Sequence, residues 1–349
     1  LQLRDLGVAL ADRLSQSVAA STHRTYAVAW NDWVIFCQVR KESPLVVEGG
    51  GEAGRLDEER LLMFCTHLAE SLSRAAGTVK NKLMGIRHVH VVHGAGDPLE
   101  GKPRIWLLLR ALQKTHKVLR RYPVTVNMLL SVHEKLDLDK TDDLILWTAI
   151  CVAFLFLLRG GEYLCHDGAD FDWPKILRGA DIKFWNLGKH VMDGMAAEEV
   201  SIMIRSSKAD VFNAGASRNH FRSGGPICAV DMLARLQRRL PQRFQGGDES
   251  ELPLFRKADG SPLFRSEVQE VIQEAAATAN VPKERIATHS LRIGGASALL
   301  HAGFSVALIQ RWGRWASDAF QSYLWESSED ARGVAAKMTS DKSTPTVTR

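Results

Sequence analysis

The chain has 349 residues, of which 45% are hydrophobic and 24% charged, a composition typical of a globular protein large enough for two domains. Its formal net charge of +5 permits a polyanionic partner but does not require one. The longest apolar run, Leu144 to Leu158, is shorter than the roughly 20 residues of a membrane span. No signal peptide is visible, and we expect no membrane among the partners.

The cysteines argue against a disulfide-stabilised fold. There are five of them, an odd number, and they form no C-x-x-C pair. This pattern is typical of reduced core residues in an intracellular protein. The chain begins at Leu1 rather than at methionine, so we expect a fragment or a processed chain.

Residues 1–121 carry helical patterns. Apolar residues at helical spacing follow Ser21 and Thr22, and the spacing recurs from Leu61 to Leu72 and from Thr78 to Val92. The glycines at 49–51 predict a loop between the first two helices.

A basic stretch ends this region. From Arg74 to Arg121 there are eleven lysines and arginines but only two acids, Asp97 and Glu100. A charged stretch is commonly just a solvated face, but the scarcity of acids favours a surface that faces DNA phosphates. The candidate DNA-binding residues are Arg74, Lys80, Lys82, Arg87, Lys114, Lys117, Arg120 and Arg121.

Three histidines within this stretch do not predict a metal site. His88 and His90 point to different sides of a helix, and no cysteine or carboxylate lies beside them or His93. We therefore expect neither a metal nor another cofactor.

Pro123 marks the best domain boundary, because proline disfavours helix at the preceding Tyr122. Two helices are predicted after it, over 126–136 and 144–158. The second delivers Arg159 into Gly160-Gly161-Glu162, where the simplest interpretation is an arginine at a helix C-cap.

A change to two-residue periodicity predicts a small antiparallel sheet. Val200, Ile202 and Ile204 alternate with polar residues, and 181–185 is the expected partner strand. The strand leads to Lys208, which as a lysine at a sheet edge is ordinarily a guard against aggregation. Helices are predicted over 226–240 and 266–279.

The last structured stretch carries the most specific pattern. Gly294 and Gly295 allow close backbone approach in a helix that Gly303 ends. Ser305 caps a second helix with Gly313 as its stop, and Ser317 begins a third, which carries one of only four tyrosines, Tyr323.

His289-x-x-Arg292, an apolar helix pair, a glycine-containing turn and Tyr323 together resemble the carboxy-terminal half of tyrosine recombinases, the phage-integrase family. The sequence GRWASDAFQSY resembles the corresponding motif of family members carried by crypton- and DIRS-type mobile elements. The resemblance implies a mainly α fold with a small antiparallel β-sheet. It places a helical SAM-like core-binding domain at 1–121, the catalytic domain at 122–326 and a polar tail at 327–349.

The resemblance also implies a catalytic set of Arg159, Lys208, His289, Arg292 and Tyr323. Arginine forks suit phosphoryl oxygens, lysine can protonate a leaving oxygen, and tyrosine can attack phosphorus. The family usually places His or Trp between the second arginine and the tyrosine. Counting back from Tyr323 points to Arg314, whereas residue type points to Trp315. We favour Trp315 and expect Arg314 to face outward.

The function that the resemblance implies is site-specific DNA recombination or integration through a 3′-phosphotyrosyl intermediate. The alternatives are a type IB topoisomerase-like enzyme that relaxes DNA and a domesticated DNA-binding protein without the reaction. The expected partners are double-stranded DNA and further copies of the chain, as a dimer or tetramer. The expected compartment is intracellular: the nucleus in a eukaryote, otherwise the cytoplasm or nucleoid.

Overall fold

The computed structural model describes residues 6, 9–10, 13–14, 16–46, 51–115, 119–205 and 215–325. The chain divides into two compact units, Leu1–Leu119 and Arg120–Arg349. This division lies two residues before the boundary expected from Pro123. The expected polar tail and two of the three loop glycines, at 49–50, lie outside the described residues, and the third, Gly51, begins a helix instead of lying in a loop.

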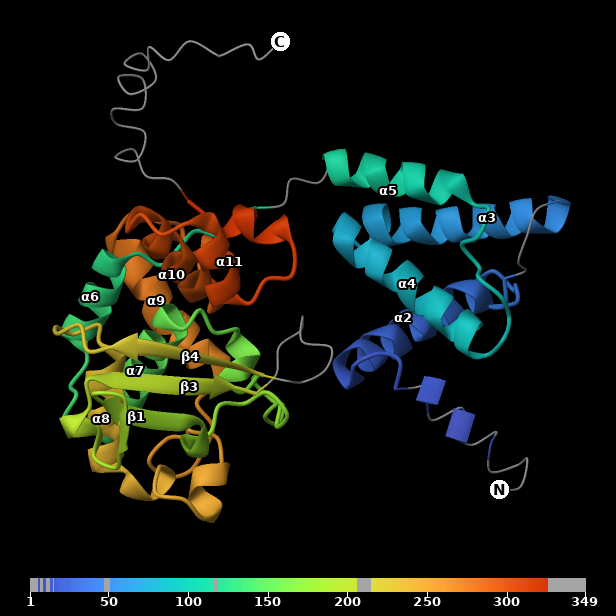
Figure 1. Cartoon of the computed structure of the whole chain (residues 1–349). Coiled ribbons are helices and arrows are strands. Elements are labelled where there is room, and N and C mark those ends of the chain that lie inside the picture. The colour runs from blue at the N-terminus through green and yellow to red at the C-terminus, as the bar shows by residue number, and fades with distance from the viewer. Residues whose placement is uncertain are drawn as a thin grey trace, which may run out of the picture. The chain divides into compact units, whose positions relative to one another are not determined.

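The first unit is helical where it is described (Figure 1). Its helices are α2 (Ala20–Val39), α3 (Gly51–Thr66), which continues into the π-helix η1 (His67–Ser71), α4 (Ala76–Val92) and α5 (Pro103–Thr115). Its core is built on Trp33, Phe64 and Leu83, which are fully or almost fully buried. A Cβ on Gly85 would lie 2.5 Å from the Cβ of Ala29, so this glycine lets α4 approach α2 closely.

The second unit combines helices with one sheet. Its helices are α6 (Val126–Lys135), α7 (Thr141–Leu155), α8 (Ala229–Arg239), α9 (Arg265–Thr278), α10 (His289–His301) and α11 (Val306–Gly313). Single-turn 3-10 segments join them: η2 (Gly160–Glu162), η3 (Gly179–Asp181), η4 (Gly194–Ala196), η5 (Pro241–Arg243), η6 (Asp248–Glu251) and η7 (Lys283–Arg285). A longer one, η8 (Asp318–Tyr323), carries the tyrosine that was expected on a short helix.

The sheet has four antiparallel strands in the order β2 (Lys189–Val191), β1 (Ile182–Asn186), β3 (Glu199–Ile204) and β4 (Ala216–Phe221). The predicted pairing of β1 with β3 is confirmed, with Ile202 opposite Ile182. The pattern did not reveal β2 and β4, because β2 has only three residues and β4 has no buried position. Such strands form through hydrogen bonds to a neighbour rather than through an apolar face.

Helix α7 lies in the hydrophobic core of the second unit, and α10 packs against it. Ten of its residues are buried, as expected for an apolar run flanked by charges. A Cβ on Gly295 would lie 2.2 Å from the carbonyl oxygen of Phe154 in α7, and a Cβ on Gly294 would lie 2.0 Å from that of Val124. The predicted close backbone approach is therefore confirmed, and it brings the start of α10 beside the end of α7.

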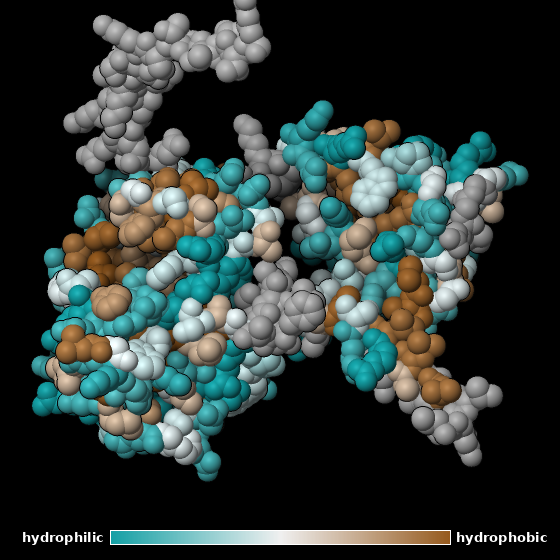
Figure 2. Space-filling view, in the orientation of Figure 1, coloured by the Kyte–Doolittle hydropathy of each residue, from teal (hydrophilic) through white to brown (hydrophobic). Residues whose placement is uncertain are grey.

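In Figure 2 the visible surface around the sheet is largely polar (teal), with apolar (brown) side chains gathered toward the α10 and α11 end of the second unit. In the part of the chain that the structure describes, no helix is both long and apolar enough to cross a membrane.

Candidate active site

Glu162 is the centre of a buried charge cluster. Its side chain is only 3% exposed and accepts hydrogen bonds from both terminal nitrogens of Arg314, at 3.0 and 2.9 Å. Arg159 adds its main-chain N–H at 2.9 Å and its Nη1 at 3.1 Å. One carboxylate therefore holds two guanidinium groups in fixed positions. Of the two, Arg159 keeps an accessible surface, with its side chain 26% exposed.

The end of α7 supplies a second anchor for arginines. The helix stops at Leu155, and Leu157 adopts a left-handed conformation with φ of 50°. The N–H of Leu158 bonds the carbonyl of Ala153 at 3.0 Å, which gives a Schellman-type cap without a glycine. A buried leucine in this conformation is strained by roughly 1–3 kcal/mol. Its carbonyl accepts hydrogen bonds from both Arg292 and Arg314, which stabilise the cap.

Arg292 lies in the interior, 1% exposed, as its place in an apolar helix would suggest. Its terminal nitrogens donate to the carbonyls of Leu157 and Gly313. The centre of its guanidinium lies 4.2 Å from the ring centroid of Trp315. Both terminal nitrogens are thus held by main-chain carbonyls, which fixes the guanidinium under the indole.

The expectation that only one of Arg314 and Trp315 contacts the site is wrong. Arg314 does not face outward: it is 9% exposed and pairs with Glu162. Arg314 rather than Gly313 takes the left-handed conformation at the end of α11, with φ of 59°. That turn sends the two side chains to different parts of the cluster, Arg314 to the carboxylate and Trp315 to Arg292.

Gly313 serves a different purpose from the helix stop that was predicted. It lies within α11, and a Cβ there would be 1.6 Å from an atom of the Trp315 ring. Glycine is needed because the indole packs against the main chain. The ring also packs 5.5 Å from Phe320 and 5.4 Å from Tyr323, between centroids.

The structure places Tyr323 beside His289. Their ring centroids are 5.0 Å apart and their planes meet at 70°. With Trp315 on another side, the tyrosine ring has one polar and one apolar neighbour, and it remains partly exposed. His289, Arg292, Trp315 and Tyr323 are therefore brought together. Arg314 is linked to Arg292 through the shared carbonyl of Leu157, and Arg159 is linked to Arg314 through Glu162.

The concentration of cations changes the pKa values in this site. Burial, and then the charges of Arg292 and Arg159, lower the pKa of His289 to about 4, so its imidazole is neutral at pH 7. Burial and the other arginines lower the pKa of Arg292 to about 9, which leaves it charged. Burial pushes the pKa of Glu162 upward, but the ion pair with Arg314 outweighs it and the pKa is lowered.

Two contributors to this site were not singled out from the sequence. Glu162 had a signal, the Arg-x-x-Glu spacing after an apolar helix. Arg265, the first residue of α9, had none. A Cβ on Gly160 would lie 2.7 Å from its guanidinium, so this glycine makes room for the arginine beside Arg159. The predicted Lys208 lies between β3 and β4, outside the described residues.

The predicted DNA-binding residues of the first unit fall into two groups. Arg74, Lys80 and Lys114 are exposed. Lys82 instead forms an ion pair with Asp32, and Arg87 pairs with Asp97 at 2.7 Å. Because α2 contributes Asp32, the basic stretch is less positive in space than in sequence. Lys117 lies outside the described residues.

The remaining two, Arg120 and Arg121, begin the second unit and are exposed. Arg121 makes one long contact, 3.5 Å from Nη1 to the carbonyl of Glu284. Arg120 is engaged more closely, with main-chain carbonyls on either side of Tyr323.

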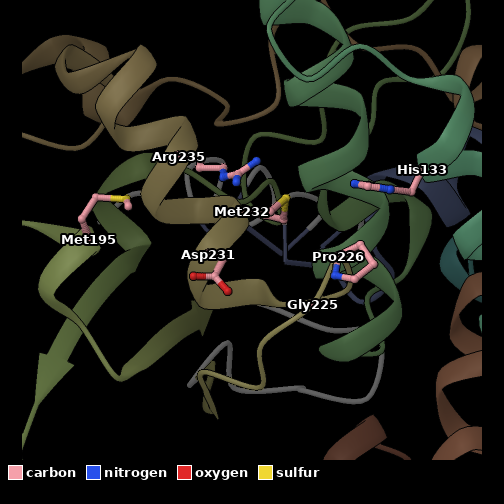
Figure 3. Close-up of a pocket in the computed structure, with 7 residues that line it drawn as sticks. All are labelled: His133, Met195, Gly225, Pro226, Asp231, Met232 and Arg235. Atoms are coloured by element: carbon pink, nitrogen blue, oxygen red, sulfur yellow. The ribbon is translucent and has the colours of Figure 1, made fainter.

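A separate pocket of about 500 Å³ lies on the second unit (Figure 3). It is lined by His133, Met195, Gly225, Pro226, Asp231, Met232 and Arg235, none of which belongs to the cluster around Glu162. No group of three or more His, Cys, Asp or Glu side chains suited to a metal ion occurs within the described ranges.

No protein-family model and no curated protein matches this sequence. Solved structures do match. A structure of XerH site-specific recombinase bound to palindromic difH substrate, a post-cleavage complex, has a TM-score of 0.57 at 16% identity, covering 90% of this chain and 79% of that one. The pre-cleavage complex with difH has a TM-score of 0.54 at 16% identity, covering 90% and 78%.

A lambda integrase (75–356) dimer bound to a COC′ core site matches with a TM-score of 0.53 at 12% identity, covering 91% of this chain and 97% of that one. At such low identity these matches establish the fold. The chain has the mainly helical fold of the tyrosine recombinases, with a small antiparallel sheet.

Proposed function

We propose that this chain is a site-specific DNA recombinase or integrase that cuts and rejoins strands through Tyr323. The observation that carries the proposal is the packing of the Tyr323 ring against His289 and Trp315, beside a cluster of buried arginines. A phenol next to fixed guanidinium groups suits attack on a phosphodiester, because the cations stabilise charge on the non-bridging oxygens. The fold shared with XerH and lambda integrase supports the same class of reaction.

In the proposed reaction the Tyr323 oxygen bonds to phosphorus and the 5′ oxygen of the next nucleotide leaves. Neutral His289 accepts a hydrogen bond from the phenol, as its lowered pKa allows. Arg159, the more accessible arginine, contacts the phosphate, and Arg314 and Glu162 hold it in place. Attack by a new 5′ hydroxyl then releases Tyr323 and seals the strand. No step calls for a metal or another cofactor.

Lys208 is proposed to protonate the leaving 5′ oxygen. Replacing that oxygen with sulfur gives a leaving group that needs no proton. Lys208→Ala should then fail on ordinary DNA and recover on the sulfur substrate. Equal defects on both substrates would remove Lys208 from this role.

The exposed cations Arg74, Lys80 and Lys114 are proposed to contact the DNA backbone. We also propose that the chain acts as a homo-oligomer on DNA. The resemblance of its GRWASDAFQSY sequence to crypton and DIRS recombinases suggests a mobile element as its source.

Trapping the covalent intermediate tests the proposal. The DNA that flanks the gene is first searched for repeats, which supply a candidate target sequence. The substrate is a nicked duplex of this sequence that loses its 5′ fragment after cleavage, so that the strand cannot be resealed. Wild type should form a protein–DNA adduct that Tyr323→Phe does not form, with Tyr26→Phe as the matched control. An adduct in Tyr323→Phe would refute the assignment, and relaxation of plasmids lacking the site by a monomer would indicate a topoisomerase instead.

A further inference from the structure

The first residue of the second unit, Arg120, contacts the Tyr323 segment. Leu119 is the last residue of the first unit and Arg120 the first of the second. The Arg120 side chain donates from Nε to the Ser322 carbonyl at 2.9 Å, and from Nη2 to the carbonyls of Ser322 and Leu324 at 2.6 and 2.7 Å. One guanidinium therefore spans the two peptide carbonyls on either side of Tyr323.

Arg120 is itself held at this place. Its guanidinium lies 4.2 Å from the ring centroid of Trp325, and its own carbonyl accepts a hydrogen bond from Arg285 Nε at 2.6 Å. Tyr122 packs on the same indole, with centroids 4.8 Å apart. These contacts leave the Arg120 fork a narrow range of positions.

The opposite side of the segment is held by α10. Ser297 donates its hydroxyl to the Tyr323 carbonyl at 3.2 Å and accepts from the Trp325 N–H at 3.1 Å. Successive carbonyls of the segment therefore bond to different partners. Those of Ser322 and Leu324 accept hydrogen bonds from Arg120, and that of Tyr323, between them, accepts one from Ser297. Because η8 is a 3-10 helix, in which hydrogen-bond geometry is poorer than in an α-helix, side-chain bonds of this kind are needed to fix its end.

We propose that Arg120 is a positioning residue for Tyr323: it sets the place of the tyrosine by chelating the carbonyls of Ser322 and Leu324, rather than by binding DNA. The proposal rests on the proposed function, in which Tyr323 is the nucleophile.

The planar fork explains why this residue is arginine. Nε and Nη2 point in fixed directions and reach two acceptors at once, whereas a lysine ammonium is a point charge without that geometry. Charge and fork can therefore be separated by substitution. Arg120→Lys keeps the charge that a DNA contact would need, and Arg120→Met removes both charge and fork.

The test is single-turnover cleavage of the nicked duplex at saturating DNA, with binding and melting temperature measured in parallel. We expect Arg120→Met to cleave about 10- to 100-fold more slowly than wild type, the size of effect produced by misplacing a reacting group by about 1 Å. Arg120→Lys should bind DNA like wild type and still cleave slowly. Full recovery of cleavage in Arg120→Lys would overturn the proposal, since charge alone would then suffice.

A second arm removes the tyrosine from the reaction. In a Tyr323→Phe background, hydrogen peroxide serves as the nucleophile: its oxygen bonds to phosphorus and the 5′ oxygen leaves as a hydroxyl. Adding Arg120→Met to this background should leave peroxide-driven cleavage within about 2-fold, because no tyrosine needs positioning. A loss equal to that in the tyrosine reaction would place Arg120 at the phosphate and refute the proposal.

These arms separate two kinds of failure. If Tyr323→Phe with Arg120 intact still forms the covalent adduct, the proposed nucleophile is wrong. If the adduct depends on Tyr323 but Arg120→Met forms it at the wild-type rate, only the positioning role is wrong. Should Arg120→Met melt early, Arg120→Lys carries the comparison, since it retains a positive charge that can lie over the Trp325 ring.

Discussion

In the basic stretch of the first unit, Arg74, Lys80 and Lys114 are exposed, whereas in the second unit Arg292 and Arg314 of the candidate site are buried. Arg104 of the first unit is an example of an exposed pair: its side chain is 51% exposed and pairs with Glu59 at 2.5 Å. In the second unit Arg314 and Glu162 are 5% and 3% exposed. An exposed pair of this kind contributes at most about 1 kcal/mol, while breaking a buried pair costs about 3–5 kcal/mol.

The difference teaches what each arrangement can do. Exposed cations keep their solvent contact and can exchange it for a phosphate, which suits binding along a DNA backbone. Buried arginines are fixed before a substrate arrives, which suits stabilising charge that develops during a reaction. Three single substitutions and one triple substitution test this contrast.

The largest effect is expected from Glu162→Gln. It leaves Arg314 buried without a counter-charge and should lower the free energy of unfolding by about 3–5 kcal/mol. Glu134→Gln is the matched control, because Glu134 is exposed on α6 and its loss should change stability by less than about 0.5 kcal/mol. Urea titrations measure the free energy of unfolding of both variants. Equal free energies for Glu162→Gln and Glu134→Gln would contradict a buried, paired Glu162.

His289 should make the protein sensitive to acid. Its pKa is about 4 in the folded chain, against 6.5 when unperturbed, so the unfolded state binds the proton more readily. The contribution of neutral His289 to the free energy of unfolding is therefore fully present above pH 6.5. It is lost as the pH falls toward 4, and the loss from this group is at most about 3 kcal/mol.

His289→Asn should lack this part of the pH dependence. Urea titrations at intervals between pH 7 and pH 4 compare its slope with that of wild type. Glu162 does not affect the comparison above pH 4.5, because its lowered pKa confines its own loss of stability to lower pH, and both proteins carry it. Parallel curves for the two proteins would show that His289 is accessible and charges freely.

Gly313→Ala should disturb the contact between α11 and the Trp315 ring. With the new Cβ 1.6 Å from a ring atom, the indole must move, at a cost of about 1–3 kcal/mol, and cleavage should fall with it. Gly77→Ala is the control, since nothing lies within 4 Å of a Cβ there. Thermal melting and adduct formation are measured together. An unchanged cleavage rate in Gly313→Ala would mean that the position of Trp315 does not matter to the reaction.

The smallest effect on stability is expected in the first unit. Replacing Arg74, Lys80 and Lys114 by glutamine should change the unfolding free energy by less than about 1 kcal/mol. The plot of the logarithm of the DNA-binding constant against the logarithm of the salt concentration should nevertheless become less steep, by about 0.9 in slope for each phosphate contact removed. Arg24, Lys41 and Arg55, exposed cations outside the basic stretch, form the matched triple. The same slope change in both triples would deny the basic stretch any special role.

The local order of this protein could be predicted from its sequence. Helical spacing located α4 and α7, alternation located β1 and β3, and Gly303 ends α10 with φ of 81°. Each of these depends on residues close along the chain, where periodicity and capping act. The order of His289, Arg292 and Tyr323 was likewise readable, through a resemblance rather than through geometry.

Tertiary structure alone decided where the charges go. The basic stretch looked almost free of acids, yet Lys82 meets Asp32 from another helix. Arg314 was expected outside and is buried, because Glu162 and the carbonyl of Leu157 reach it from a segment about 150 residues earlier. Whether a charged side chain is solvated or buried depends on partners that only folding brings together, and a linear pattern carries no record of them.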